Sequence, residues 1–233
     1  MTNHAVLTIS RYPAKHKITA FHSMALFRPS LALNKAISFF KLMGTGRNGT
    51  FDKNPDWQQY AIFSVSGIDG LPPMNLPYQQ WRNKYYGAFI NRYWNWAGAE
   101  TTTYILEPIL SHGTWNKKII FPTPLSAGMP GEQIAVLTRA SIRISKAREF
   151  WANVPPVQQQ MAETEGLLYS VGIGELPYLR QSTFSIWKDE ASMKAFAYKM
   201  QEHREVIQKT RSRNWYSEEM FTRFRILQTL SNK

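Results

Sequence analysis

A titratable side chain stands on an apolar helical face near the carboxyl end of the chain. The stretch AFAYKMQEHREVIQKT, residues 195–210, contains His203, and the apolar residues around it follow the three-and-four spacing of an α-helix. The residues on this face are Met193, Phe196, Met200, His203, Ile207 and Thr210. His203 is therefore predicted to point inward. There an imidazole either forms hydrogen bonds within the core or binds a metal or cofactor.

The metal-binding side chains of the sequence are few. Cysteine is absent, which excludes disulfides, iron–sulfur clusters, zinc–cysteine sites and a thiolate-bound haem. Histidine occurs at positions 4, 16, 22, 112 and 203, and no two of these stand at the i, i+4 spacing of a helical metal pair. A site with several histidines would need residues that are distant in the sequence.

Composition favours an ordinary globular protein. The 233 residues, 43% of them hydrophobic, suffice for one large domain or two small ones. No window approaches the roughly 20 apolar residues of a membrane span, and the start MTNHAVLTISRYPAKHK lacks the order of a secretory signal. We therefore expect a cytoplasmic protein, with peripheral contact to a membrane left open.

The formal charge of +12 indicates attraction to something anionic. The basic residues are spread along the chain, and the densest run, HREVIQKTRSRNW, includes acids and matches no nucleic-acid signature. We expect no nucleic-acid partner. An acidic protein, a charged cofactor and a membrane surface stay open as partners.

The second half of the chain predicts the element order βαββαβ. Its expected elements are strands at 132–144, 167–176, 181–187 and 220–230, and helices at 145–154 and from 190 to about 214. Ser145 and Asp189 are the expected caps of the two helices, and the Pro155–Pro156 pair interrupts the first. His203 therefore lies on the second helix of this half.

The first half repeats this order, with strands at 5–12, 36–44, 58–65 and 101–110 and helices at 16–29 and 78–96. This is the ferredoxin-like unit, an antiparallel sheet with both helices on one face. We expect an α+β protein with tandem ferredoxin-like units at 1–116 and 133–233, joined by a Pro- and Gly-rich linker at 117–132. Two such units commonly pack sheet to sheet as a single-chain α+β barrel of the dimeric type.

Four segments resemble the signature segments of the spheroidene monooxygenase family of carotenoid ketolases. They are SFFKLMGTG (38–46), VLTRASIR (136–143), VGIGELPYLRQSTFSIW (171–187) and NWYSEEMFTRFRIL (214–227). The resemblance extends over nearly the whole chain and is weakest between about Ser66 and Pro130.

The resemblance implies an enzyme that contains haem b and uses electrons from a donor such as a ferredoxin. Its substrate would be an acyclic carotenoid or another hydrophobic molecule. Two hydroxylations of one terminal carbon would give a geminal diol, which loses water to leave a ketone. The resemblance also extends to haem enzymes with paired ferredoxin-like units, whose axial histidine comes from a helix of the C-terminal half. His203 matches that description, so it is the predicted iron ligand.

Other residues could contact such a haem. Arg139 and Arg143 share one face of the predicted strand at 132–144, where a guanidinium could polarise bound oxygen or pair with a propionate. They are the predicted catalytic residues, and the alternative is that they face solvent or pair with acids. Gly172 and Gly174 share one face of the next strand, where glycine could admit a flat macrocycle. A β-bulge or tight sheet packing would explain these glycines equally well.

Aromatic residues concentrate in WRNKYYGAFINRYWNWAG (81–98). They are expected to pack against the N-terminal sheet, and a channel for a long polyene is the alternative.

For the whole protein, a haem monooxygenase is the favoured interpretation. The alternatives are a haem enzyme that dehydrates an aldoxime without a reductant, and a non-catalytic binding module in which His203 is only buried.

Overall fold

The computed structural model describes residues 3–47, 52, 54–122, 131–199 and 213–232. Within these ranges the chain forms eight β-strands and six α-helices. Contacts divide it into two compact units. Unit 1 contains Met1–Thr45, Asp56–Glu107 and Ile226–Lys233, and unit 2 contains Gly46–Pro55 and Pro108–Arg225. The α+β class with two ferredoxin-like units is confirmed.

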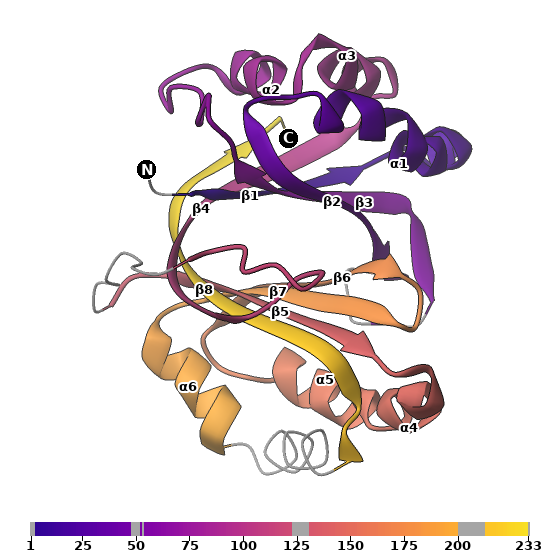
Figure 1. Ribbon diagram of the computed structural model, residues 1–233, viewed down its shortest axis with the longest axis vertical. Helices are drawn as coiled ribbons and strands as arrows, with labels where there is room; N and C mark the ends of the chain where they lie inside the picture. The colour runs from indigo at the N-terminus through magenta and orange to yellow at the C-terminus, as the bar shows by residue number, and fades with distance from the viewer. Residues whose placement is uncertain (1–2, 48–51, 53, 123–130, 200–212, 233) are drawn as a thin grey trace. The chain divides into compact units, whose positions relative to one another are not determined.

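Unit 1 has an antiparallel sheet with the order β4-β1-β3-β2, which is the ferredoxin-like order. Its strands are β1 (Ala5–Arg11), β2 (Ile37–Gly46), β3 (Pro55–Ser66) and the first part of β4 (Glu100–Gly113). Its helices are α1 (Lys17–Ala32), which follows the 3-10 turn η1 (Ala14–His16), α2 (Tyr78–Tyr86) and α3 (Ala88–Trp96). These helices cover one face of the sheet (Figure 1).

Unit 2 repeats the arrangement with the strand order β8-β5-β7-β6. Its strands are β5 (Ile134–Ile142), β6 (Leu167–Leu176), β7 (Arg180–Trp187) and β8 (Tyr216–Ser231) as far as Arg225. Its helices are α4 (Ala147–Ala152), which follows the turn η3 (Ile144–Lys146), α5 (Val154–Ala162) and α6 (Glu190–Lys199). They too lie on one face of their sheet (Figure 1).

The ends of the helices agree with the sequence in part. The backbone N–H of Ser192 donates to Asp189 Oδ1 at 2.7 Å, which confirms the predicted cap of α6. Ser145 does not cap α4: it lies inside η3, and α4 begins without a side-chain cap. Pro155 lies in the first turn of α5, where its missing N–H leaves no hydrogen bond unmade.

The predicted helix at 78–96 is two helices. Gly87 has φ 88° and ψ 162°, a backbone conformation that is essentially confined to glycine, and it separates α2 from α3. The aromatic side chains nevertheless pack on the N-terminal sheet as expected: Trp81, Tyr85, Tyr86 and Trp94 are buried. The packing interpretation of this segment is confirmed.

None of the described helices combines the length and the apolar character that a membrane crossing requires.

Candidate functional site

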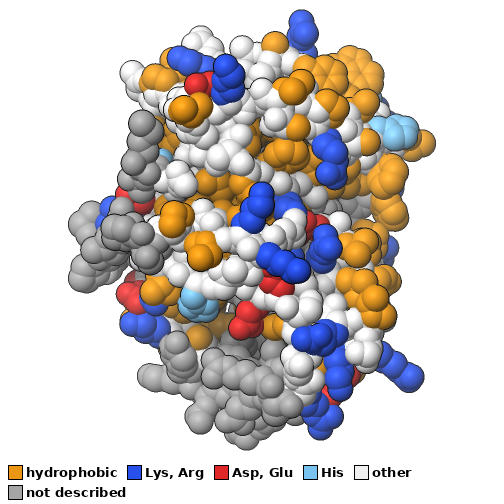
Figure 2. Space-filling view, in the orientation of Figure 1, with side chains coloured by type: hydrophobic (Ala, Val, Ile, Leu, Met, Phe, Trp, Pro, Cys, Tyr) orange, Lys and Arg blue, Asp and Glu red, His pale blue; other side chains and the backbone are white. Residues whose placement is uncertain are grey.

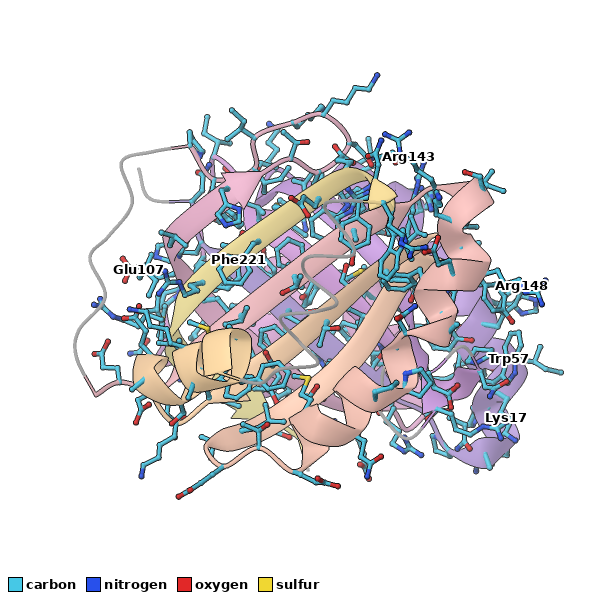
Figure 3. The ribbon with its side chains drawn as sticks, turned by 90° about the horizontal axis from the view of Figure 1, so that it is seen from below. Lys17, Trp57, Glu107, Arg143, Arg148 and Phe221 are labelled. Carbon is cyan, nitrogen blue, oxygen red and sulfur yellow. The ribbon has the colours of Figure 1, made fainter. Side chains whose placement is uncertain are left out.

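Strand register in unit 2 aligns a row of mostly small residues on the helix-covered face of the sheet. Gly172 of β6 lies opposite Thr183 of β7, which lies opposite Thr138 of β5, which lies opposite Phe221 of β8. Residues directly opposite one another in an antiparallel sheet point to the same face. Figure 3 looks onto this face and shows Phe221 on β8. We call Gly172, Thr183, Thr138 and Phe221 the central row.

Apolar clusters occupy the same face on both sides of the central row. On one side Ile134 and Val136 pack with Trp187 and with Met193 and Phe196 of α6. On the other side Ile142 packs with Phe150 of α4 and with Trp215. Between the clusters, three of the four residues in the row are small: one glycine and two threonines. Among the residues that the structure describes, Phe221 is the only large side chain of the row, and it packs against the first cluster.

An arginine lies beside the central row on the same face. Arg223 is two residues beyond Phe221 on β8 and lies opposite Val136 of the apolar cluster. Its Nη1 forms an ion pair with Glu190 at the start of α6. Its buried Nε has no hydrogen-bond partner among the residues that the structure describes. A buried, unpartnered donor is uncommon in a folded protein, and an oxygen-bearing ligand would satisfy it.

His112 of β4 also borders the row. Its imidazole stacks on the Phe221 ring, with centroids 5.1 Å apart and planes inclined by 19°. His112 and Arg223 were both missed as candidates from sequence. Neither stands in a motif, and only the pairing of β8 with its neighbours shows which face they occupy.

The predicted glycines do share this face. A Cβ on Gly174 would lie 3.0 Å from the amide group of Gln181 and 3.1 Å from the carbonyl oxygen of Arg180. Sheet packing therefore accounts for Gly174, and the register shift beside it is the irregularity that a bulge introduces. Gly172 belongs to the central row, so it is the glycine that a flat ligand would approach.

Arg139 faces the other way. It pairs with Ser182 and Met220, so it lies on the sheet face opposite to Gly172 and Gly174. Its side chain is 1% exposed and forms an ion pair with Glu218, and its Nη2 lies 3.7 Å from Glu175 Oε1. Arg139 and the two glycines cannot contact the same face of one ligand.

Glu218 is the centre of the Arg139 cluster. It accepts hydrogen bonds from Thr114 Oγ1 at 2.8 Å, from the Asn116 N–H at 3.1 Å and from the Lys117 N–H at 2.5 Å. Burial by itself would raise the pKa of Glu218, but these hydrogen bonds and the charge of Arg139 lower the pKa to about 2. The cluster holds a turn to two strands, which is the pairing with acids that was the alternative for Arg139.

The remaining predicted residues lie apart from the central row. Arg143 follows the last residue of β5, is exposed, and lies where this strand ends (Figure 3). The expectation that it shares a strand face with Arg139 is wrong, because the strand ends at Ile142 and the chain turns into η3. His203 lies outside the described residues. Within the described part of the chain, no three histidine or acidic side chains form a metal-binding group.

Unit 1 provides an internal comparison. There Thr8 of β1 points to the helices, and its hydroxyl hydrogen-bonds Tyr86 Oη at 2.7 Å. Burial raises the pKa of Tyr85 and of Tyr86 far enough that both stay protonated. Arg82, also buried, donates to Asn91 at 2.7 Å and to Thr101 at 2.7 Å. Aromatic rings and the hydrogen bonds of Thr8 and Arg82 thus fill the helix side of the unit 1 sheet, where the described central row of unit 2 has a glycine and two threonines.

Comparison with curated proteins identifies homologues over most of the chain. The chain is 33% identical over 208 residues to spheroidene monooxygenase of Rhodobacter capsulatus, covering 88% of this chain and 82% of the relative. It is 32% identical over 193 residues to spheroidene monooxygenase of Cereibacter sphaeroides, covering 82% of this chain and 56% of that relative. No model of a protein family matches the chain.

Solved structures share the fold at low sequence identity. An aldoxime dehydratase in complex with butyraldoxime superposes with a TM-score of 0.59 at 7% identity, covering 97% of this chain and 79% of that one. A second aldoxime dehydratase structure gives a TM-score of 0.58 at 9% identity, covering 97% and 81%. At such identities the likeness shows the fold alone.

Proposed function

The chain belongs to the spheroidene monooxygenase family, and on that basis we propose that it is a haem-dependent monooxygenase acting on a long apolar substrate of the carotenoid class. Its curated relatives are monooxygenases, and the enzyme class of the chain follows from them. Haem dependence and the carotenoid substrate are the parts that we propose.

The central row is the observation that supports a flat prosthetic group in unit 2. Between two apolar clusters, and as far as the described residues go, the sheet presents Gly172 and the hydroxyls of Thr138 and Thr183 in place of bulky side chains. In unit 1, whose strand order is the same, the helix side of the sheet is closed by aromatic rings. A rigid planar ligand with an apolar body fits the difference between the two units.

Two residues could hold a haem. His203 would supply the axial imidazole, which is the ligand suggested by its place in the sequence. Arg223 would supply a cation for a propionate, because its Nε is buried and unpartnered among the described residues. When bound, haem supplies the iron at which oxygen is activated.

The side chains around the central row would then position the substrate. The apolar clusters flank the central row, which favours an apolar substrate there. The hydroxyls of Thr138 and Thr183 can donate hydrogen bonds to an oxygen atom held above the row. Arg139 is buried on the opposite face, so its proposed role is to support the sheet.

The test is conversion of an acyclic carotenoid by the full chain supplied with haem. The proposal expects a keto product only when oxygen and a reduced ferredoxin with its reductase are both present, with the product oxygen derived from O₂. A matched reaction uses butyraldoxime under argon without the ferredoxin. Turnover of the aldoxime there, with no carotenoid product in air, would contradict monooxygenase chemistry.

A further inference from the structure

The helix layer of unit 1 has an unusual charge distribution. Helices α1, α2 and α3 contain five basic residues and no aspartate or glutamate. The basic residues are Lys17, Arg28, Arg82, Lys84 and Arg92. All but Arg82 are exposed, and within the described ranges none of these four lies within ion-pair distance of a carboxylate. The layer is therefore a surface of unpaired positive charge.

The same layer exposes large apolar side chains, which we call the apolar helix patch. Its members, with their exposed fractions, are Ile18 (74%), Phe21 (54%), Leu26 (47%), Leu33 (85%), Phe89 (43%) and Trp96 (68%). Ring contacts connect α1 to α3: Phe27 contacts Phe89 at 6.3 Å and Tyr93 at 5.1 Å, and Tyr93 contacts Trp96 at 5.7 Å. In Figure 2, hydrophobic side chains gather over α1, in the upper right of the view.

Helix α1 is apolar on both of its sides. Ala20, Phe27 and Leu31 are buried against the sheet, while Ile18 and Phe21 point outward. A soluble surface helix usually places polar residues on its outer side, and a helix that is apolar all round usually has an apolar neighbour there as well. Phe21 contacts the ring of Trp57 of β3 at 6.0 Å, yet Ile18 and Phe21 both stay more than half exposed.

Charge and apolar character together identify the partner. We propose that the apolar helix patch and the basic residues around it dock the protein on a bilayer that contains anionic phospholipid. Aromatic and aliphatic side chains would enter the boundary between headgroups and acyl chains, while Lys17, Arg28, Lys84 and Arg92 contact the headgroups. A purely electrostatic protein contact, such as an acidic electron donor would make, does not require six exposed apolar side chains.

This docking does not depend on haem, and it extends the proposed function in one respect. Carotenoids dissolve in the bilayer and not in water, so an enzyme that rests on the membrane meets an apolar substrate where it is concentrated. That consequence rests on the proposed substrate class. The docking itself rests only on the residues of unit 1.

Vesicle sedimentation tests the docking directly. The full chain is mixed with vesicles of phosphatidylcholine alone, or of phosphatidylcholine in which roughly one third of the lipid is replaced by phosphatidylglycerol. We expect it to sediment with the anionic vesicles, to bind the neutral ones more weakly, and to be released in part by salt. Replacement of three patch residues, Ile18→Ser, Phe21→Ser and Trp96→Ser, should weaken binding by about tenfold or more.

The matched control makes three equivalent changes on exposed side chains of unit 2, namely Ile144→Ser, Leu168→Ser and Leu176→Ser, and should bind like the parent. Charge reversal at Lys17 and Arg92 should weaken binding to anionic vesicles by roughly fivefold or more for each residue, whereas reversal at the exposed Arg180 and Lys188 of unit 2 should have a smaller effect. Circular dichroism confirms that each variant is folded.

Three results would overturn the proposal. The first is no binding of the parent to anionic vesicles at low salt. The second is equal loss of binding in the unit 1 and unit 2 serine variants. The third is a pair of observations: the serine variant of unit 1 binds vesicles as well as the parent does, and the charge reversals abolish binding of the protein to an acidic ferredoxin. That third result would make the surface a protein-docking site. A missing haem band would leave the vesicle result unaffected.

Discussion

Glu218 joins three parts of unit 2. It receives hydrogen bonds from Thr114 Oγ1 and from the backbone of the turn at Asn116 and Lys117, and it pairs with the buried Arg139 of β5. Asn116 and Lys117 have φ angles of 54° and 61°, which are costly for residues other than glycine. The carboxylate offsets that cost by satisfying the two N–H groups of the turn.

Glu218→Gln should lower the free energy of unfolding at pH 7 by roughly 2–4 kcal/mol, because it removes the charge that Arg139 and the turn require. The folded-state pKa of Glu218 is about 2, below its ordinary value of 4.5. The carboxylate therefore stabilises the fold fully above pH 4.5, and this stabilisation is lost as the pH falls toward 2. Urea unfolding of parent and variant between pH 7 and about pH 3 measures the difference between their free energies of unfolding. This difference should become smaller as the pH falls below the ordinary pKa of Glu218.

Glu219→Gln is the control for that measurement. Glu219 is the next residue of β8 and is exposed. Its substitution should change the free energy of unfolding by no more than about 0.5 kcal/mol. A difference between parent and Glu218→Gln that stays constant with pH would show that the Glu218 carboxylate does not carry the stabilisation.

Arg223 and Arg225 provide a test of the proposed contact between Arg223 and a haem propionate. Both lie on β8, both point to the helix-covered face, and each forms an ion pair with one glutamate. Of these two arginines, Arg223 has a buried Nε without a hydrogen-bond partner among the described residues, whereas Arg225 Nε donates to Glu132 at 3.0 Å. Arg223→Gln should therefore lower haem affinity by about tenfold or more, while Arg225→Gln should leave it within about twofold of the parent.

Haem titration followed by absorbance measures both affinities, and Arg223→Lys should restore part of the loss because it keeps the charge. Equal haem affinity in Arg223→Gln and the parent would show that Arg223 does not contact haem.

The sequence alone could not select Arg223. The residue pattern predicted Arg139 and Arg143 as the basic residues near a haem. The face that each arginine occupies depends on where β5 ends and on how β8 pairs with it, which the pattern does not show.

Gly87 determines how the aromatic segment of unit 1 is divided. The residue pattern from 78 to 96 is compatible with one helix, yet Gly87 ends α2 and precedes α3 in a conformation with φ 88° and ψ 162°. The break lets Tyr85 and Tyr86 reach the sheet from α2 while Trp94 reaches the same core from α3. The two short helices thus contribute aromatic side chains to one core.

Gly87→Ala should lower the free energy of unfolding by about 1–3 kcal/mol, because a Cβ is strained at this φ and ψ. The matched control is Gly44→Ala. Gly44 lies in β2 of the same unit, and a Cβ there would meet no atom within 4 Å. Its substitution should be neutral within about 1 kcal/mol. Thermal unfolding followed by circular dichroism compares the two, and a Gly87→Ala variant as stable as the parent would contradict the strained break.

Most elements were predictable because their signals are local. Alternating apolar residues predicted all eight strands within a few residues, and Asp189 predicted the start of α6. The failures also have local causes. Ser145 lies in a 3-10 turn, one residue before the N-cap position of α4, which Lys146 occupies. A single glycine inside a helical pattern does not show its φ angle.

The two halves of the chain repeat one fold with different interiors. Unit 1 closes the helix side of its sheet with aromatic rings, whereas the central row of unit 2 carries Gly172 and two threonines. The duplication was predictable from the repeated βαββαβ order. The difference in filling was not, because it depends on which residues face one another across four strands. The family followed from long sequence segments, and the homologues confirm it.

The distribution of charge is likewise a property of the whole chain. The sequence carries a formal charge of +12. It also shows that the segments forming α1, α2 and α3 contain no aspartate or glutamate. What the sequence could not show is that Ile18, Phe21 and Trp96 are exposed among those charges. The proposal of a bilayer partner rests on this combination and not on the net charge.

The absorption spectrum of the full chain produced with a supply of haem tests the central claim most directly. Three proteins are compared: the parent, His203→Ala and His112→Ala, the last being a control because His112 is exposed and stacks on Phe221 beside the same row. A Soret band in the parent and in His112→Ala that is lost or shifted in His203→Ala is the predicted result. A folded parent without a Soret band, or a band that is unchanged in His203→Ala, would contradict haem bound in unit 2 through His203.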